Sequence, residues 1–490
     1  MSEELELKFL VEDLLAAQEW LGLRLAVGGA DSWRTIHIAD RYFDTADGAL
    51  GAAGYGARLR RIGRQTTLTV KSDLEVRAGL HRREELEAPA TRSLDPGAWP
   101  ASEARTRVIE VAGARRLIER FRIEQERHEV EAHVDGALVA ASLDDIAVFA
   151  GGRPAGSLKQ LEVELRSGSE ADLQALGAEI AAAGIGEAES RSKMVIAAEL
   201  ANAVQRVLPS DTMAAAGRLV LRRQLLRMLE RETGARTGDP LAIKQMRVAT
   251  RRMRSGWRVF GSAFKKGARR RYVAELRRVA DALGEVRDLD VLRGGLPAEA
   301  ALEPLLAAWR ERRAAAHARL VTLLNDASYD KFVTDYLDFT SRPEAGLRRV
   351  PDEATLADAA PALLVAAADE VRAAGAAALS DGDDLAWHAL RRGARRLRYT
   401  VESLRAGIDE ITAADAIARL VRVQDVLGAM NDAAVAAHEV EAWLDASPDA
   451  SPETVRVATA FAAAQHAEIV RLRQSFAPVW QGASSLFTER

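Results

Sequence analysis

The sequence predicts an α+β multidomain protein in which a mainly antiparallel sheet domain precedes an all-α domain. Two observations carry this prediction. Apolar and charged residues alternate with period two through much of residues 1–200, which is the period of a β-strand. From about residue 214 onward, apolar residues recur at spacings of three and four, which is the period of a helix.

The composition excludes several kinds of chemistry. The 490 residues contain no cysteine, so disulfides, zinc–thiolate sites, iron–sulfur clusters and thiol catalysis are excluded. With 68 basic and 72 acidic residues, the chain as a whole is not a polycation. No apolar run approaches the ~18 residues of a membrane span, and the acidic N-terminus does not resemble a signal peptide. We therefore expect a cytoplasmic protein with no membrane partner.

Residues 1–204 are expected to form the sheet domain. Period-two alternation is clearest at 4–9, 57–61, 68–71 and 161–165. Turn-forming pairs between strands are Asp47-Gly48, Asp135-Gly136 and Gly151-Gly152. Helical spacing interrupts the strands at 11–22 and 171–183. Residues 205–217 include Pro209 and are expected to be a linker.

Residues 218–490 are expected to be helical and to contain an internal repeat. A basic stripe of Lys244, Arg247, Arg251, Arg254 and Arg258 recurs 144 residues later as His388, Arg391, Arg395, Arg398 and Glu402. Leu283-Gly284 recurs at the same offset as Leu427-Gly428, and Asp288 recurs as Asp432. Because one offset fits two separate segments, we expect two related helical bundles, at about 218–340 and 355–490, packed pseudo-symmetrically.

Charged side chains share one face on several of the predicted strands, since residues i and i+2 point the same way. These sets are Glu4, Glu6 and Lys8; Arg58 and Arg60; Thr69 and Lys71; Arg83 and Glu85; and Glu162 and Glu164. A solvent-exposed face explains any one strand. If the sheet closes, however, the same faces line a lumen with carboxylates and cations, which is a layout that holds a divalent ion together with phosphate groups.

These segments resemble the CYTH domains, or triphosphate tunnel metalloenzymes, over about residues 1–200. The matching motifs follow in family order: Glu4-x-Glu6-x-Lys8, Tyr42-Phe43-Asp44-Thr45, Arg58-Leu59-Arg60, Leu68-Thr69-Val70-Lys71, Arg83-x-Glu85, Arg127, Leu143-Asp144, Glu162-x-Glu164 and Ser192-Lys193. The resemblance implies an antiparallel eight-stranded β tunnel that binds triphosphate with Mg²⁺ or Mn²⁺.

The resemblance also implies residue roles. Glu4, Glu6, Asp144, Glu162 and Glu164 would coordinate metal or position water. Lys8, Arg58, Arg60, Lys71, Arg83, Arg127 and Lys193 would hold phosphate oxygens. The implied catalytic set is Glu4, Glu6, Lys8, Arg60, Lys71 and Glu85. Such domains often carry a carboxylate where this chain has Ala140, which leaves the second metal position open.

The helical part resembles the CHAD domain over about residues 214–490, through the two basic stripes and the Leu-Gly and Asp positions that follow them. The resemblance implies two four-helix bundles whose basic surface binds inorganic polyphosphate through Lys244, Arg247, Arg251, Arg254, His388, Arg391, Arg395 and Arg398. Lys244 stands where the family usually has a histidine. Asp288 and Asp432 are expected to orient arginines or cap helices rather than bind metal.

The local charge agrees with an anionic partner, because residues 218–278 contain 19 basic and 4 acidic residues. Nucleic acid is the less favoured partner, since there is no helix-turn-helix signature and few aromatic residues stand among the arginines. We expect metal-dependent hydrolysis of inorganic triphosphate, with the helical part binding polyphosphate and associating the protein with polyphosphate granules. The alternatives are a non-catalytic polyphosphate-binding or targeting protein, and a tunnel enzyme acting on nucleoside or thiamine triphosphate, adenylate cyclase included.

Overall fold

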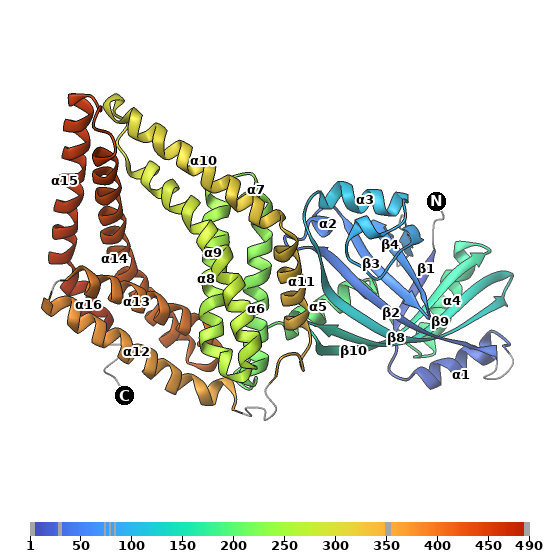
Figure 1. The fold of residues 1–490 in the computed structure, drawn as a ribbon. Coiled ribbons are helices and arrows are strands. Elements are labelled where there is room, and N and C mark those ends of the chain that lie inside the picture. Colours follow the sequence, from blue (N-terminus) through green and yellow to red (C-terminus); the bar gives the residue numbers. More distant parts are fainter. Residues whose placement is uncertain are drawn as a thin grey trace. The chain divides into compact units, whose positions relative to one another are not determined.

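The computed structural model describes residues 5–27, 32–72, 75–77, 80–82, 85–347, 354–381 and 383–484. It comprises two compact units, Met1–Arg206 and Val207–Arg490 (Figure 1). Two of the expected site residues, Glu4 and Arg83, lie outside the described residues. None of the described helices is both long and apolar enough to cross a membrane.

The first unit is built on one antiparallel sheet (Figure 1). Its longer strands are β1 (Glu6–Leu10), β2 (Arg34–Thr45), β3 (Tyr55–Ile62), β4 (Gln65–Ser72), β7 (Glu85–Pro89), β8 (Leu117–Val134), β9 (Ala137–Ala150) and β10 (Arg153–Ser167). Three short strands are β5 (Glu75–Arg77), β6 (Leu80–Arg82) and β11 (Glu187–Ala188). The expected sheet of eight strands therefore becomes eleven among the described residues, because period-two patterns are too short to detect in two- and three-residue strands.

The strand order is β5-β6-β1-β10-β9-β8-β2-β3-β4-β7, with β11 paired to β1. The two ends of this order are close along the chain, because β6, which pairs with the end strand β5, ends at Arg82, and the other end strand, β7, begins at Glu85. Three residues span at most about 11 Å, so the sheet curls round until its ends meet. No ladder joins β7 to β5 or β6 within the described residues. The strands thus surround a lumen.

Strand periodicity divides the side chains into a lumen set and an outer set. The outer apolar set packs beneath α1 (Leu14–Arg24) and α4 (Glu170–Ala182) on one side, and beneath α2 (Ala49–Ala52) and α3 (Glu103–Ala112) on the other. Helix α5 (Lys193–Val204) instead packs on the lumen set, where Ala197 and Ala201 contact a cluster that includes Ile123, Ile146 and Val148. One end of the lumen is therefore filled by apolar side chains, and the other part is polar.

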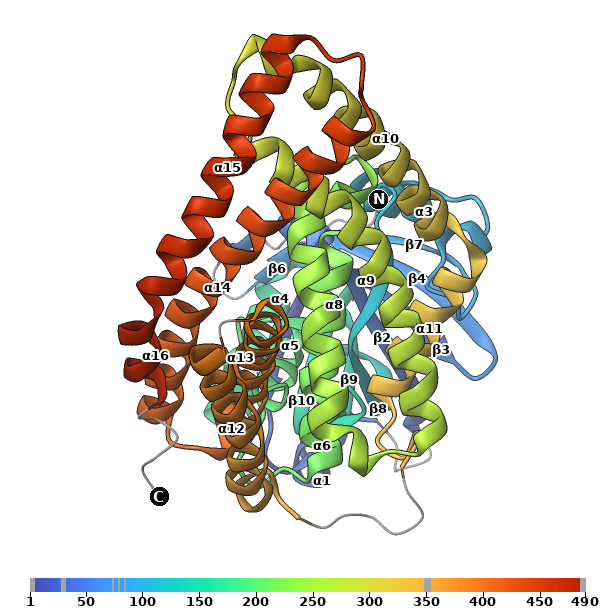
Figure 2. The same ribbon diagram turned by 60° about the vertical axis from the view of Figure 1, so that its left-hand side comes forward.

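The second unit is helical (Figures 1 and 2). Its first repeat contains α6 (Met213–Glu230), α7 (Glu232–Arg236), α8 (Pro240–Phe260), α9 (Lys266–Gly295), α10 (Glu303–Asn325) and α11 (Ala327–Ser341). Its second repeat contains α12 (Leu356–Asp381), α13 (Asp384–Leu404), α14 (Glu410–Asp445), α15 (Pro452–Gln474) and α16 (Phe476–Ser484). Helix α6 begins inside the stretch expected to be linker, because the Thr212 side chain accepts a hydrogen bond from the Ala215 N–H and caps the helix there.

The helix bounds confirm the internal repeat. Shifting α8 (240–260) by 144 residues gives 384–404, which are the bounds of α13. Both helices start at an aspartate cap, Asp239 and Asp383, whose side chain accepts backbone N–H groups. In each repeat four helices share one core: α6, α8, α9 and α11 in the first, and α12, α13, α14 and α16 in the second. A further long helix packs outside each core, α10 against α9 and α15 against α14. The core of the first repeat is aromatic and centres on the fully buried Trp257, and that of the second contains Trp387 and Phe476.

Candidate functional site

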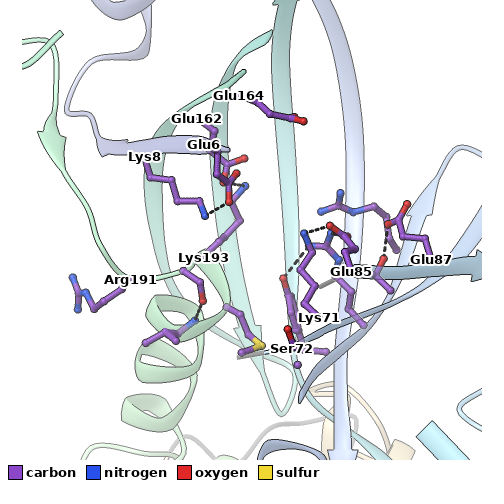
Figure 3. A pocket seen from close by; sticks show the side chains of 18 of the residues that line it. Glu6, Lys8, Lys71, Ser72, Glu85, Glu87, Glu162, Glu164, Arg191 and Lys193 are labelled. Carbon is purple, nitrogen blue, oxygen red and sulfur yellow. Dashed lines mark hydrogen bonds and ion pairs between the residues drawn. The ribbon is translucent and has the colours of Figure 1, made fainter. Parts of the chain in front are cut away.

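The polar part of the first unit's lumen is a cavity of about 390 Å³. The charged residues that line it come from β1, β3, β4, β7, β8, β10 and the N-terminal end of α5. Figure 3 shows Glu6, Lys8, Glu162, Glu164 and Lys193 on one side of this cavity and Lys71, Glu85 and Glu87 on the other. All of these residues except Glu87 were expected at the site, and Arg58, Arg60 and Arg127, which were also expected, line the same cavity.

One wall is carboxylate-rich because β1 and β10 are paired in register, with Glu6 opposite Glu164 and Lys8 opposite Glu162. The Lys8 ammonium donates to Glu6 at 2.5 Å. Burial raises the pKa of Glu164, and the neighbouring Glu6 and Glu162 carboxylates raise it further against the opposing effect of Arg166. This wall therefore holds negative charge that nearby cations compensate only in part.

Beside that wall, Asp144 holds two cations in place. Its carboxylate is fully buried and accepts two hydrogen bonds from Arg127, at 2.8 and 2.7 Å, and one from Lys193 at 2.6 Å. Arg127 also donates to Glu162 at 2.7 Å. Burial alone would raise the pKa of Glu162, but Lys193, Arg127 and Lys8 lower it well below its usual range. Asp144 does not line the cavity, so its contacts orient the cations that do.

Asp40 plays the same part across the lumen. This fully buried carboxylate of β2 accepts hydrogen bonds from Arg60 at 2.9 and 2.8 Å and from Arg58 at 3.3 Å. Arg58 also donates to the Tyr42 hydroxyl at 3.2 Å. Burial would raise the pKa of Asp40, but the two guanidinium groups lower it to about 2. Both arginines, which line the cavity, are thereby held by one buried carboxylate.

The adjoining strands β4 and β7 add a further ion pair. Lys71 lies opposite Glu85 in the ladder, and their side chains are 2.6 Å apart. Burial raises the pKa of Glu85, but Lys71 and then Arg58 lower it by more, so the net change is downward. Two residues along the same face, Glu87 accepts a hydrogen bond from Thr69 at 2.9 Å.

The residues fit a divalent cation in a limited way. Glu6, Glu162 and Glu164 offer the oxygen ligands that Mg²⁺ and Mn²⁺ prefer, and a cation beside them would relieve the repulsion that raises the pKa of Glu164. Asp144 is bonded to Arg127 and Lys193 instead. Within the described ranges, no group of three or more His, Asp or Glu side chains is placed to hold a metal ion. The arrangement suits an ion that keeps waters and takes phosphate oxygens as its other ligands.

In the second unit, α8 and α13 pack together and bring the two basic stripes to one cavity of about 410 Å³. Five pairs of positions related by the 144-residue offset line it: Arg247 and Arg391, Arg251 and Arg395, Arg287 and Asn431, Asp288 and Asp432, and Val291 and Val435. The cavity therefore lies on the pseudo-twofold axis of the repeat, and we call it the axial cavity. Lys244 also lines it, and Asp288 lies 3.3 Å from Arg247, as expected of an orienting carboxylate.

Three expected polyphosphate ligands lie outside the axial cavity. Arg254 lines a second cavity, described below. Arg398 pairs with Glu402 at 3.4 Å and lies over the ring of Tyr399. His388 is not among the lining residues of either described cavity, and burial followed by the neighbouring Arg392 lowers its pKa.

Several residues of the tunnel site were not found from the sequence. Asp40 was missed although it stands in a strand where Ile36, Ile38 and Tyr42 share its face, and a lone carboxylate in such a series is the signal that could have found it. Glu87 stands two residues after Glu85, so the rule that strand residues i and i+2 share a face could have placed it at the site. Gln125, which lies between Asp144 and Lys193, and Arg191, at the cavity edge, carry no periodic signal.

Comparison with known proteins gives two family matches and several similar structures. The family model described as the CYTH domain matches residues 2–195, and that described as the CHAD domain matches residues 219–441. Among solved structures, the CHAD domain from the plant Ricinus communis is 20% identical, covers 58% of this chain and 94% of its own, and has a TM-score of 0.47. PptA from Streptomyces chartreusis is 24% identical, with coverages of 56% and 100% and a TM-score of 0.45.

For the first unit, the similar structures include HpAC1 from Hippeastrum, an adenylyl cyclase candidate described as having a dominant triphosphatase activity. It is 21% identical, covers 39% of this chain and 94% of its own, and has a TM-score of 0.32. The chain contains a CYTH domain, over residues 2–195, followed by a CHAD domain, over residues 219–441.

Proposed function

We propose that the chain hydrolyses inorganic triphosphate in the cavity of its CYTH domain, with a divalent cation, and binds inorganic polyphosphate through its CHAD domain. The observation that carries the first half is the convergence of cations and carboxylates from six strands and one helix on a single cavity closed at one end by α5. CYTH domains include triphosphatases and related tunnel enzymes, which agrees with this arrangement.

The charge balance of the cavity favours a metal-bound substrate. The seven lining cations are Lys8, Arg58, Arg60, Lys71, Arg127, Arg191 and Lys193. The five lining carboxylates are Glu6, Glu85, Glu87, Glu162 and Glu164, and the two buried aspartates behind them bring the negative charges to seven as well. Bare triphosphate would add several negative charges to this neutral set of described residues. Each divalent metal ion bound to the triphosphate removes two of these charges.

The side chains suit phosphoryl transfer to water. The leaving phosphoryl group spreads negative charge over its oxygens, and cations fixed beforehand stabilise that charge without reorganising. Asp40 and Asp144 fix four of these cations, namely Arg58, Arg60, Arg127 and Lys193. A divalent cation beside Glu6 and Glu164 would polarise phosphate oxygens and offset their charge. Glu6 and Glu164 also offer acceptors for a water molecule in the cavity.

The assay is release of phosphate from triphosphate by the purified full chain with Mg²⁺ or Mn²⁺. We expect turnover that falls at least 100-fold in Glu6→Gln and Arg60→Ala, about 2.7 kcal/mol of transition-state stabilisation. Glu126→Gln is the matched control, because Glu126 is an exposed carboxylate on the outer face of β8. No turnover in the wild type would remove the enzymatic proposal. Faster turnover of ATP or thiamine triphosphate than of inorganic triphosphate would show that the preferred substrate is an organic triphosphate.

The polyphosphate half rests on uncompensated charge in the axial cavity, where six cations face two carboxylates. The Nε atoms of Arg251 and Arg391 are buried and have no hydrogen-bond partner among the described residues. Burial and neighbouring arginines lower the pKa values of Arg251 and Arg395, that of Arg395 to about 10. A bound polyanion would relieve this repulsion. We expect polyphosphate binding to weaken in the double variant Arg247→Ala with Arg391→Ala.

A further inference from the structure

The charge of the CHAD domain does not follow its pseudo-symmetry. Residues 218–278 contain 19 basic and 4 acidic residues, whereas the equivalent window 144 residues later, 362–422, contains 9 of each. Part of the excess lies on α9, where Lys266, Arg269, Arg270 and Arg277 stand. Their equivalents on α14 are Glu410, Ala413, Ala414 and Val421. A ligand that needs these cations can therefore bind on one side of the axis only.

These four α9 residues line a cavity of about 760 Å³ between α8, α9 and α13, which we call the off-axis cavity. Ten cations and no carboxylate are among its lining residues. Burial lowers the pKa values of Arg254 and Arg258, and their arginine neighbours lower them further. The off-axis cavity is thus more strongly positive than the axial one, where Asp288 and Asp432 offset part of the charge.

The two cavities adjoin, because Arg251 and Arg395 line both of them. Along α8, Lys244 of the axial cavity and Arg258 of the off-axis cavity are 14 residues apart, which is about 21 Å at 1.5 Å per residue. Triphosphate, with only two bridging oxygens, is too short to reach from Lys244 to Arg258. A long, flexible and uniformly charged polymer can do so.

We infer that the off-axis cavity is a second polyphosphate-binding site, which extends the axial site in one direction and selects for chain length. The inference rests on the proposed function of the CHAD domain. A chain enters the axial cavity, passes between Arg251 and Arg395, and continues along α9. The matching path along α14 lacks the cations, so each bound chain lies asymmetrically on a pseudo-symmetric domain. Occupancy of both cavities by one molecule makes affinity rise with chain length beyond that of the axial cavity alone.

The test measures binding of inorganic polyphosphate of graded length to the full chain without added metal. The variant combines Arg269→Ala, Arg270→Ala and Arg277→Ala, all at exposed positions, so the fold is not at risk. We expect affinity for long chains to fall about tenfold, since three exposed charge contacts are each weak, while the shortest chains that bind keep their affinity. The matched control is Arg422→Ala, at an exposed arginine of α14, which should change neither.

The outcomes are distinguishable. If the wild type binds no polyphosphate of any length, the proposed function of the CHAD domain fails. If the wild type binds long chains and the triple α9 variant binds them equally well, the off-axis site is refuted while the axial one stands. If the variant loses long and short chains alike, length selection is refuted. If duplex DNA of matched charge binds as tightly as polyphosphate, and the variant loses both equally, the site recognises nucleic acid and the polyphosphate assignment is refuted.

Discussion

Replacing Asp40 by asparagine tests how the cavity holds its cations. Asp40 is fully buried and is bonded by both Arg58 and Arg60. Asparagine has nearly the same shape but no charge, so the two guanidinium groups would lose their common counter-ion and one acceptor. We expect a less stable protein and, because Arg58 and Arg60 face the cavity, weaker binding of triphosphate.

The magnitude follows from the pKa of Asp40, which falls from 3.8 to about 2 on folding. At about 1.4 kcal/mol for each tenfold change in acidity, ionised Asp40 contributes roughly 2–3 kcal/mol to folding. Because the folded-state pKa is lower than the unfolded one, this contribution is fully present above about pH 4 and is lost as the pH falls toward 2. Asp40→Asn should remove about this much at neutral pH.

The assay pairs urea unfolding with steady-state kinetics on triphosphate. We expect a loss of roughly 2–3 kcal/mol at neutral pH, smaller at about pH 3, together with a KM raised about tenfold. Asp145→Asn is the control, because Asp145 is the exposed neighbour of Asp144 on the outer face of β9. A loss of stability with unchanged KM would show that Asp40 supports the fold alone. Unchanged stability would refute the electrostatic argument itself.

Three further predictions concern single positions. Gln160→Met should stabilise the ligand-free protein by about 1 kcal/mol in urea unfolding, because both amide atoms of this fully buried residue have no partner among the described residues; a loss above that amount would show an unseen partner. The affinity for Mn²⁺ should still rise with pH above the usual pKa range of glutamate, because the raised pKa of Glu164 lets a proton compete with the metal there. Calorimetry should show that the affinity of Glu164→Gln depends less on pH, and an equal pH dependence in the variant and the wild type would refute this. Tyr336→Phe should cost about 1–3 kcal/mol of thermal stability by leaving the Trp257 N–H, now 2.7 Å from the hydroxyl, without an acceptor; a neutral effect would contradict it.

Periodicity carried much of the fold. The strands that face an apolar core on one side and a charged lumen on the other show clear alternation, and β1 and β10 were expected with the correct side chains sharing a face. The repeat offset of 144 residues located α13 from α8. The three short strands were missed because two or three residues cannot display a period, and the start of α6 was missed because a single capping threonine decides it.

The site was harder to predict than the fold, because motifs name residues and not their contacts. Asp144 illustrates this: its motif implies a metal ligand, but the structure commits both of its oxygens to Arg127 and Lys193. Asp40 shows the converse, since no motif marked it and only the register of β2 with β3 reveals its partners. The unequal basic charge of the two CHAD repeats can be counted from the sequence, but only the packing of the helices shows that these basic residues line one cavity.

The most direct measurement of the central claim is a crystal structure of the full chain soaked with triphosphate and Mn²⁺. We expect anomalous density for manganese beside Glu6 and Glu164, with phosphate oxygens held by Arg60, Arg127 and Lys193 in the same cavity. Triphosphate found only on the arginines of α8 and α13, with the CYTH cavity filled by water alone, would contradict it.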